Sequence, residues 1–285
     1  MAALGQCCAG VAPAPGSMPS AVWDQTSAWY TSTMSPGTST LAFSLLSHLG
    51  ILGVTTPAEG GLRVLETHCG DALAASMVLP APGVASYTAC DFSEQMLRCA
   101  QENLGDKALF KQADSTALPF EAGSFDRYMS NMGGCCVSDL DAKLREAYRV
   151  LAPGGIAAMS MRLEAGDGDS SFALINETLK PLGYPAAAQD REGLQLGKDL
   201  AALKAKLRSV GFKGEVAWRT WVILPVHDEF AFSSFATSFP PVQKWFSGLD
   251  EATRAEATEA LRAAGKAVLE TGSIQIAVAA VVAKK

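Results

Sequence analysis

VLETHCGDA, residues 64–72, joins the end of an apolar run to an acid and a tight, glycine-containing turn. The residues up to the acid, Leu62–Glu66, predict a short buried strand, and Ala72–Leu79 predict a helix. A strand, a tight turn and a helix in this order form the first unit of a doubly wound α/β sheet. In such sheets, ligands bind at the carboxyl ends of the strands.

The same alternation continues toward the C-terminus. The helix at Ser93–Leu104 has the clearest pattern, because Ser93 can cap it and Met96, Leu97 and Ala100 recur on one face. Strands alternating with helices indicate βαβ units and a parallel sheet. The further segments predicted in this pattern are strands at Ala85–Cys90, Ala108–Ala113, Ser124–Met129 and Ile156–Met161, and a helix at Asp139–Leu151 stopped by Pro153-Gly154-Gly155.

The flanking regions are less regular. On the N-terminal side, Thr40–Leu52 predicts a helix with a leucine-rich face, capped by Thr38 or Ser39 and ended by Gly53. Residues 1–20 are rich in Ala, Gly and Pro and predict a disordered tail. Beyond Leu163 we expect helices at Phe172–Leu179, Leu200–Val210 and Glu251–Leu269, and strands at Glu215–Leu224 and Ser273–Ala283.

Composition excludes several classes of protein. The 285 residues are 48% hydrophobic, enough to bury a sizeable core, and a net charge of −6 disfavours a general nucleic-acid binder. No apolar run reaches the ~20 residues that span a bilayer. The first basic residue is Arg63, so a basic targeting leader is not expected. Seven cysteines with no CxxC pair indicate reduced thiols and a cytoplasmic protein.

Acids stand at three of the predicted strand ends. Asp91 can accept hydrogen bonds from both hydroxyls of a ribose, and Asp114 can accept from an adenine amino group. Phe92 can lie against the adenine face, and Gly70 lets the backbone approach a ligand because it has no Cβ. Glu66 can hold the loop or meet an ammonium group through a water. The alternative is that these acids are only helix caps or turn residues.

Four motifs, taken together, resemble a known family. VLETHCGDA (64–72), CDFSEQML (90–97), ADSTALPFEAGSFDRYMSNM (113–132) and LREAYRVLAPGG (144–155) are similar, in order and spacing, to the motifs of class I S-adenosylmethionine-dependent methyltransferases. The resemblance is closest to the small-molecule branch typified by ubiquinone/menaquinone biosynthesis methyltransferases, and it covers about Leu62–Met161.

The resemblance implies a Rossmann-like, doubly wound, mostly parallel seven-stranded sheet with an antiparallel last strand. It implies a helical cap at 21–60, and a methyltransferase domain at 61–285 with a lid at about 221–270. The cofactor implied is S-adenosyl-L-methionine and the partner a small-molecule substrate, with no nucleic acid and no metal. The cofactor-binding residues implied are Glu66, His68, Gly70, Asp91, Phe92, Met96, Asp114, Ser115, Asn131 and Tyr30, and those of the substrate pocket are Trp29, Met132 and Phe235.

The loop departs from the family at two positions. His68 and Ala72 stand where the family usually has the first and third glycines of its loop, and only Gly70 remains. A side chain at position 68 must fit where the backbone usually nears the ligand. Either the loop has shifted, or His68 points into the pocket.

No general base stands out. His68 and Tyr30 are weak catalytic candidates, and His48, His227, Cys135 and Cys136 are weaker still, since buried thiols and packed histidines are common. The aromatic stretch Phe230–Phe246 fits either simple packing or a pocket cover.

Two other functions compete with methyl transfer. A nicotinamide-dependent oxidoreductase would need a GxGxxG turn after the first strand, and the sequence has none. A non-catalytic module that binds the cofactor or a protein partner stays open because of His68. A nucleic-acid substrate is not expected, because Asn131-Met132-Gly133-Gly134 lacks the Asn-Pro-Pro-aromatic motif of many such enzymes.

Overall fold

The computed structural model describes residues 20–52, 60–163, 170–185 and 192–285. Its centre is a seven-stranded sheet with strand order β3-β2-β1-β4-β5-β7-β6. Strands β1 to β5 run parallel to one another, and β7 runs antiparallel to both β5 and β6. The expected fold class is thereby confirmed. The strands are β1 (Leu62–Thr67), β2 (Val84–Asp91), β3 (Leu109–Gln112), β4 (Phe125–Ser130), β5 (Leu151–Arg162), β6 (Lys213–Ile223) and β7 (Gln275–Lys284).

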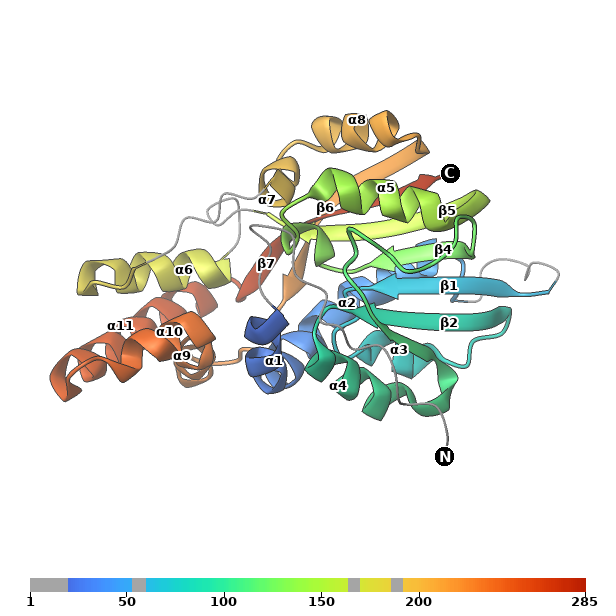
Figure 1. Cartoon of the computed structure of the whole chain (residues 1–285). Coiled ribbons are helices and arrows are strands. Elements are labelled where there is room, and N and C mark those ends of the chain that lie inside the picture. Colours follow the sequence, from blue (N-terminus) through green and yellow to red (C-terminus); the bar gives the residue numbers. More distant parts are fainter. Residues whose placement is uncertain (1–19, 53–59, 164–169, 186–191) are drawn as a thin grey trace.

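Helices cover both faces of the sheet (Figure 1). The α-helices are α1 (Ser20–Trp29), α2 (Ser35–His48), α3 (Leu73–Val78), α4 (Glu94–Leu104), α5 (Leu140–Val150), α6 (Ser170–Leu179), α7 (Glu192–Leu196), α8 (Leu200–Val210), α9 (Glu229–Ser238), α10 (Pro240–Ser247) and α11 (Glu251–Leu269). A π-helix, η1 (Tyr30–Met34), joins α1 to α2, and three 3₁₀ turns are η2 (Gly105–Lys107), η3 (Gly133–Cys135) and η4 (Lys180–Leu182).

Alternating side chains of the strands supply two apolar cores. Val64 packs in the core shared with α2, α3 and α4, whereas its neighbour Leu65 packs in the core shared with α5 and α8. Tyr128 and Met129 divide between the two cores in the same way, as the period-two geometry of a strand requires. The centre of the sheet is therefore buried on both faces, which explains why β7 is almost continuously apolar, whereas the edge strands β3 and β6 are largely exposed.

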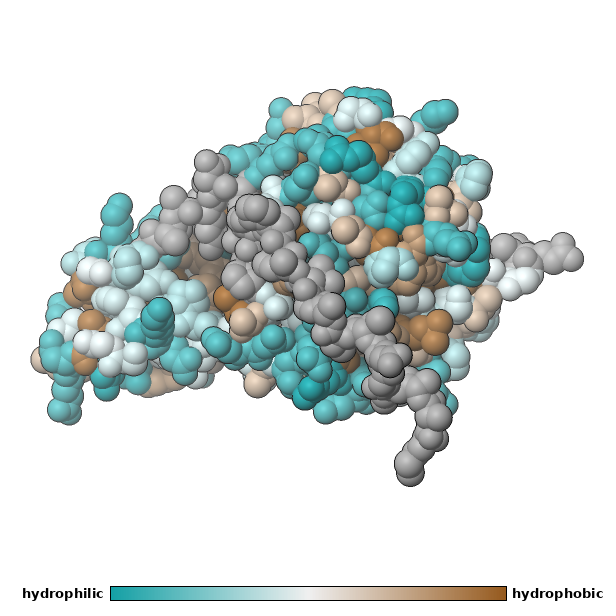
Figure 2. Space-filling model, viewed as in Figure 1, coloured by the Kyte–Doolittle hydropathy of each residue, from teal (hydrophilic) through white to brown (hydrophobic). Residues whose placement is uncertain are grey.

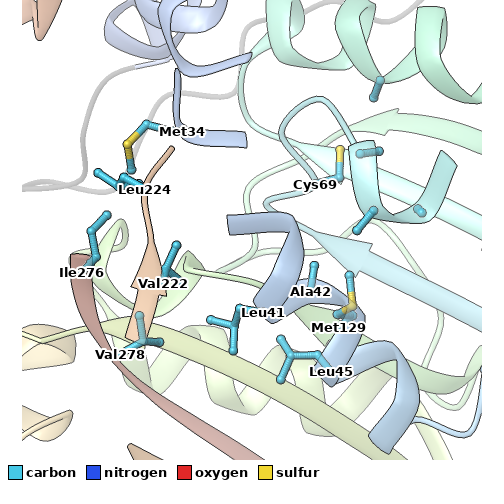
Figure 3. Close-up of a cluster of buried hydrophobic side chains, with 14 of the residues drawn as sticks. Met34, Leu41, Ala42, Leu45, Cys69, Met129, Val222, Leu224, Ile276 and Val278 are labelled. Atoms are coloured by element: carbon cyan, nitrogen blue, oxygen red, sulfur yellow. The ribbon is translucent and has the colours of Figure 1, made fainter. Parts of the chain in front are cut away.

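α2 packs directly on the sheet. Leu41, Ala42 and Leu45 of this helix meet Met129 of β4 and the side chains of β6 and β7 (Figure 3). The leucine face predicted from the sequence is buried. The helix itself begins at Ser35, earlier than the expected start at Thr40, because Pro36 fits the first turn of a helix and Thr38 and Ser39 lie inside it.

The helices α6, α9, α10 and α11 project away from the sheet (Figure 1). α11 contacts α9 and α6, and an aromatic cluster that includes Phe232, Phe235 and Phe239 fills the space between them. Their outer surface is mostly hydrophilic with separate apolar patches (Figure 2). Phe230 of α9 is 58% exposed. Among the described helices, none combines the length and the apolar character needed to cross a bilayer.

Several expectations need correction. β5 begins at Leu151, so Pro153-Gly154-Gly155 lies within the strand, where the pairing with β4 shifts register. The α5 helix ends at Val150, before the proline. α1, η1, α7, α9 and α10 were not predicted from sequence periodicity, because they are short or bury few residues. The predicted tail lies outside the described residues, except that Ser20 begins α1.

Candidate functional site

A pocket of about 810 Å³, counted to its open mouth, lies at the carboxyl ends of β1, β2 and β4. Its walls are Trp23, Tyr30, Thr67, His68, Gly70, Asp91, Phe92, Met96, Ala113, Asp114, Ser115, Asn131, Met132, Cys136 and Val137. A smaller pocket adjoins it and shares Tyr30, His68 and Asn131. The two together have the position of a ligand site in an open α/β sheet.

The β1–α3 loop forms the floor between the two pockets. His68, Gly70 and Ala72 all have left-handed backbones, with φ of 56°, 56° and 51°. This explains why glycine suits these positions and why His68 and Ala72 are strained there. A Cβ on Gly70 would lie 3.5 Å from the Tyr30 ring, so Tyr30 lies close over the loop. The loop thus keeps the left-handed backbone that favours glycine at three positions, although two of them are occupied by His68 and Ala72.

Asp91 ties the first two strand ends together. One carboxylate oxygen accepts from the Gly70 N–H at 3.0 Å, and the other accepts from the Ser93 N–H at 2.9 Å. Burial raises the pKa of Asp91, and the backbone N–H groups of Ser93 and Gly70 oppose that rise. Each oxygen keeps a second lone pair. Asp91 therefore fixes the loop and can still accept from a ligand.

Part of the wall of the larger pocket combines apolar and polar side chains. Phe92 and Met96 line it beside Ser115 and Asp114. The Asp114 carboxylate accepts from the N–H and the hydroxyl of Thr116, both at 2.8 Å, in an Asx-type turn. Asp114 is thus a turn residue and a pocket residue at once.

Two further acids face the smaller pocket. Glu66 accepts from the Tyr87 hydroxyl at 2.7 Å, and burial raises the pKa of Glu66 to about 8. Asp71 accepts from the Ser35 hydroxyl at 2.7 Å through one oxygen, while its other, buried oxygen has no hydrogen bond of normal geometry from the part of the chain that the structure describes. Burial also raises the pKa of Asp71. Both carboxyls line a pocket that suits a cationic group.

Asn131 and Met132 follow β4. The Asn131 amide donates to the Thr38 carbonyl at 3.0 Å and accepts from the Ser160 hydroxyl at 2.8 Å, so it anchors α2 to the sheet. Met132 also has a left-handed backbone, with φ of 56°, and lines the larger pocket. Tyr30 hydrogen-bonds Thr38 at 3.2 Å, and burial raises its pKa, so it stays protonated.

His68 points inward from the loop. Its Nε2 lies 3.5 Å from the Ser115 hydroxyl, and its Nδ1 lies 3.4 Å from both the Ser130 hydroxyl and the Lys143 amine. Burial, and then the charge of Lys143, hold the pKa of His68 well below its usual range. The sequence left two arrangements open, a shifted loop or a His68 side chain at the pocket. In the structure, His68 is one of the pocket walls.

The cysteine pair also reaches the pocket. Cys136 lines it, and the Sγ atoms of Cys135 and Cys136 are 3.9 Å apart. The contact with Cys136 and the charge of Arg162 lower the pKa of Cys135 to about 6. Among the described residues, no group of three or more metal-ligating side chains is found.

Four other candidates lie away from the two pockets. Trp29 donates to the Ser238 hydroxyl at 2.8 Å and packs on Phe235 within the aromatic cluster. The His48 ring packs 4.8 Å from Trp218, and His227 lines a different groove beside β6. Neither Trp29 nor Phe235 is among the pocket walls, so their substrate role stays a prediction.

Several site residues were not predicted from the sequence, among them Trp23, Ser35, Asp71 and Lys143. Trp23, Ser35 and Asp71 depend on how α1 and η1 fold over the loop, which no periodic pattern shows. Lys143 carried a signal: it stands on the inward stripe of α5 with Leu140, Leu144 and Ala147, where a charge is unexpected. A lysine on an apolar stripe beside the strand ends marks a functional candidate.

Comparisons with known proteins find similarity to methyltransferases. Residues 65–159 match the family model of the methyltransferase domain. The chain is 38% identical over 103 residues to the ubiquinone/menaquinone biosynthesis C-methyltransferase of Rhizobium johnstonii, covering 34% of this chain and 40% of that protein. It is 33% identical over 108 residues to the demethylmenaquinone methyltransferase of Desulfitobacterium hafniense, covering 36% and 43%. The resemblance to the small-molecule branch is confirmed.

These matches span less than half the length of the curated relatives. Over nearly the whole chain, the fold is similar to a chain in the complex between the Haloferax volcanii Trm112 methyltransferase activator and its partner. The TM-score is 0.56 with 19% identity, covering 92% of this chain and 96% of that one. At this identity, the likeness supports the fold alone.

Proposed function

We propose that this chain, whose residues 65–159 match a methyltransferase domain, transfers a methyl group from S-adenosylmethionine to a small-molecule acceptor. The observation that carries the proposal is the gathering of Glu66, Asp71 and Asp91 around two joined pockets. Burial raises the pKa of all three, as expected of carboxyls placed to receive a cationic ligand.

The residues fit this cofactor. Asp91 would accept from the ribose hydroxyls, and Phe92 and Met96 would flank the adenine, with Asp114 and Ser115 at its edge. The second oxygen of Asp71 and the Glu66 carboxyl would receive the ammonium of the methionine part. Gly70 lets the backbone lie close to the ligand.

When bound, the cofactor supplies a methyl group that its sulfonium charge has already activated. The chain's own part is to orient the acceptor and to exclude water, which can lower the barrier by ~7–11 kcal/mol. Tyr30, Met132, Cys136 and Val137 would form the wall that faces the acceptor. The C-methyltransferase names of the relatives favour a small apolar acceptor. We also propose a cytoplasmic location, because seven cysteines with no CxxC pair are the pattern expected of reduced thiols.

Calorimetric titration with S-adenosylhomocysteine, followed by turnover assays with phenols, quinols, thiols and amines, tests the proposal. We expect binding, and transfer to at least one acceptor class. Failure of the folded protein to bind S-adenosylhomocysteine would refute the function. Binding without turnover on any acceptor would favour the alternative, a non-catalytic module that binds the cofactor or a protein partner.

A further inference from the structure

Lys143 is a charged side chain in an apolar place. It is 1% exposed and lies on the inner face of α5 with Leu140 and Leu144. Among the described residues, no carboxylate lies within ion-pair distance of its amine. Burying a lysine without a carboxylate partner is costly, although Cys135, Cys136 and Asp114 favour its charged form. Buried ionisable groups of this kind are often found at functional sites, where they influence neighbouring polar groups.

The neighbours of the Lys143 amine are two polar atoms at the pocket floor. Nζ donates to the Ser130 hydroxyl at 2.8 Å and lies 3.4 Å from Nδ1 of His68. An ammonium group can only donate. At 3.4 Å it acts on the ring mainly through its charge, which disfavours a proton on the facing nitrogen. Nδ1 of His68 is therefore the bare nitrogen.

The proton of a neutral His68 then belongs on Nε2. This nitrogen is the one that faces Ser115, and both residues line the pocket. Burial and the Lys143 charge lower the pKa of His68, so the ring is neutral at ordinary pH.

We propose that Lys143 is a positioning residue that holds His68 as its Nε2–H tautomer, so that the pocket floor presents a hydrogen-bond donor to an acceptor nitrogen or oxygen of a bound nucleoside. The tautomer assignment does not depend on the proposed function, whereas the identity of the ligand rests on the proposed function. A ring that carries its proton on Nε2 cannot take a proton there from a methyl acceptor. His68 is thereby a ligand-reading group instead of a general base.

The ring is also held sterically. A Cβ on Gly133 would lie 2.6 Å from Nδ1 and 2.7 Å from Cγ of His68, so the ring packs flush against a glycine. Real Cβ contacts are longer than this. The fixed orientation, together with a left-handed backbone at φ 56°, keeps one ring edge toward Lys143 and the other toward the pocket.

Nitrogen-15 NMR of the histidine rings tests the tautomer directly. The chain has only three histidines, so signals can be assigned with His48→Gln and His227→Gln variants. We expect the wild-type His68 ring to show a protonated Nε2 and a bare Nδ1. In Lys143→Met the preference should weaken, while in Lys107→Met, an exposed lysine, it should not. A wild-type ring protonated on Nδ1 would overturn the proposal.

A pH titration of the wild type gives a second measurement that needs no variant. The charged or titratable groups that face Lys143 are Cys135 and Cys136 from η3 and Asp114 after β3, and burial lowers the pKa of Lys143 to about 8. Above that pH the amine becomes an acceptor, so the Nδ1–H form of His68 should grow. NMR is the appropriate readout, because Glu66 titrates in the same range and affects binding. A tautomer that does not change between pH 7 and ~10 would contradict the role of Lys143.

Ligand binding separates this inference from the proposed function. At pH 7, Lys143→Met should bind S-adenosylhomocysteine about 3- to 10-fold more weakly than Lys107→Met, the scale of one hydrogen bond. Equal affinities would show that the His68 Nε2–H does not donate a hydrogen bond to the ligand. A wild type that binds no S-adenosylhomocysteine yet shows the Nε2–H ring would sink the proposed function and leave the tautomer assignment standing.

Discussion

At the residue scale, the site is built from side chains that serve the fold and the ligand together. Asp91 accepts from two backbone N–H groups, and Asp114 closes its own turn. Asn131 joins α2 to β4 and β5 through two hydrogen bonds. The acids at the strand ends could be predicted from the sequence. Their second partners could not, because these belong to residues distant in the chain.

Replacing Asp91 by Ala should weaken S-adenosylhomocysteine binding by ~1.5–3 kcal/mol, the scale of hydrogen bonds to a charged group. Calorimetry is the measurement, with Asp106→Ala, an exposed acid in η2, as the control that should bind like wild type. An Asp91→Ala affinity equal to that of wild type would refute the ribose assignment.

Replacing Gly133 by Ala should destabilise the protein by about 1–3 kcal/mol, because the new methyl group would overlap both the Ser130 hydroxyl and the His68 ring. Urea unfolding measures this. Gly248→Ala is the matched control, since its Cβ would meet only the Trp245 carbonyl oxygen at 3.6 Å. If the two variants unfold at the same urea concentration, the described packing of His68 is wrong.

Glu66 makes the stability depend on pH. Its folded-state pKa, about 8, exceeds the ordinary value of 4.5. The stability that it contributes is therefore fully present below about pH 4.5 and is lost as the pH rises through about 8. Glu66→Gln should remove this loss and be more stable than wild type at pH 9 by a few kcal/mol, on the order of 3 to 5. The check is to measure the unfolding free energies of the wild type and of Glu66→Gln at pH 5, 7 and 9. If the two proteins change equally with pH, the raised pKa of Glu66 is wrong.

At the element scale, periodicity predicted the elements that bury a regular face. The predicted bounds of α8 and α11 agree with the structure to the residue, and Ser93 caps α4 by accepting from the Met96 N–H. The π-helix η1 has no such signature, since it depends on how Tyr30 and the residues after it fold over the β1–α3 loop. It is nevertheless the element that brings Tyr30 to the pocket, as π-helical turns at functional sites often do.

Shortening one side chain at the centre of α2 tests whether this helix is part of the core. Leu45 is fully buried between α2 and the sheet, so Leu45→Ala should cost about 2–5 kcal/mol of unfolding free energy. Phe230→Ala, which removes an exposed ring from α9, should cost far less. Chemical denaturation with similar losses for both would show that α2 does not pack as described.

For the whole molecule, three acids lie around two joined pockets. The chain as a whole carries a charge of −6, which also favours a cationic ligand. The mostly parallel seven-stranded sheet with an antiparallel last strand could be predicted from the family resemblance, and the helices α6, α9, α10 and α11 add an aromatic cluster beside it.

The most direct measurement is a crystal structure of the full chain grown with S-adenosylhomocysteine. The account predicts the ribose hydroxyls on Asp91, the adenine between Phe92 and Met96, and the amino acid end beside Glu66 and Asp71. A saturated crystal in which the molecule binds elsewhere, or in which those three carboxyls make no contact with it, would contradict the account.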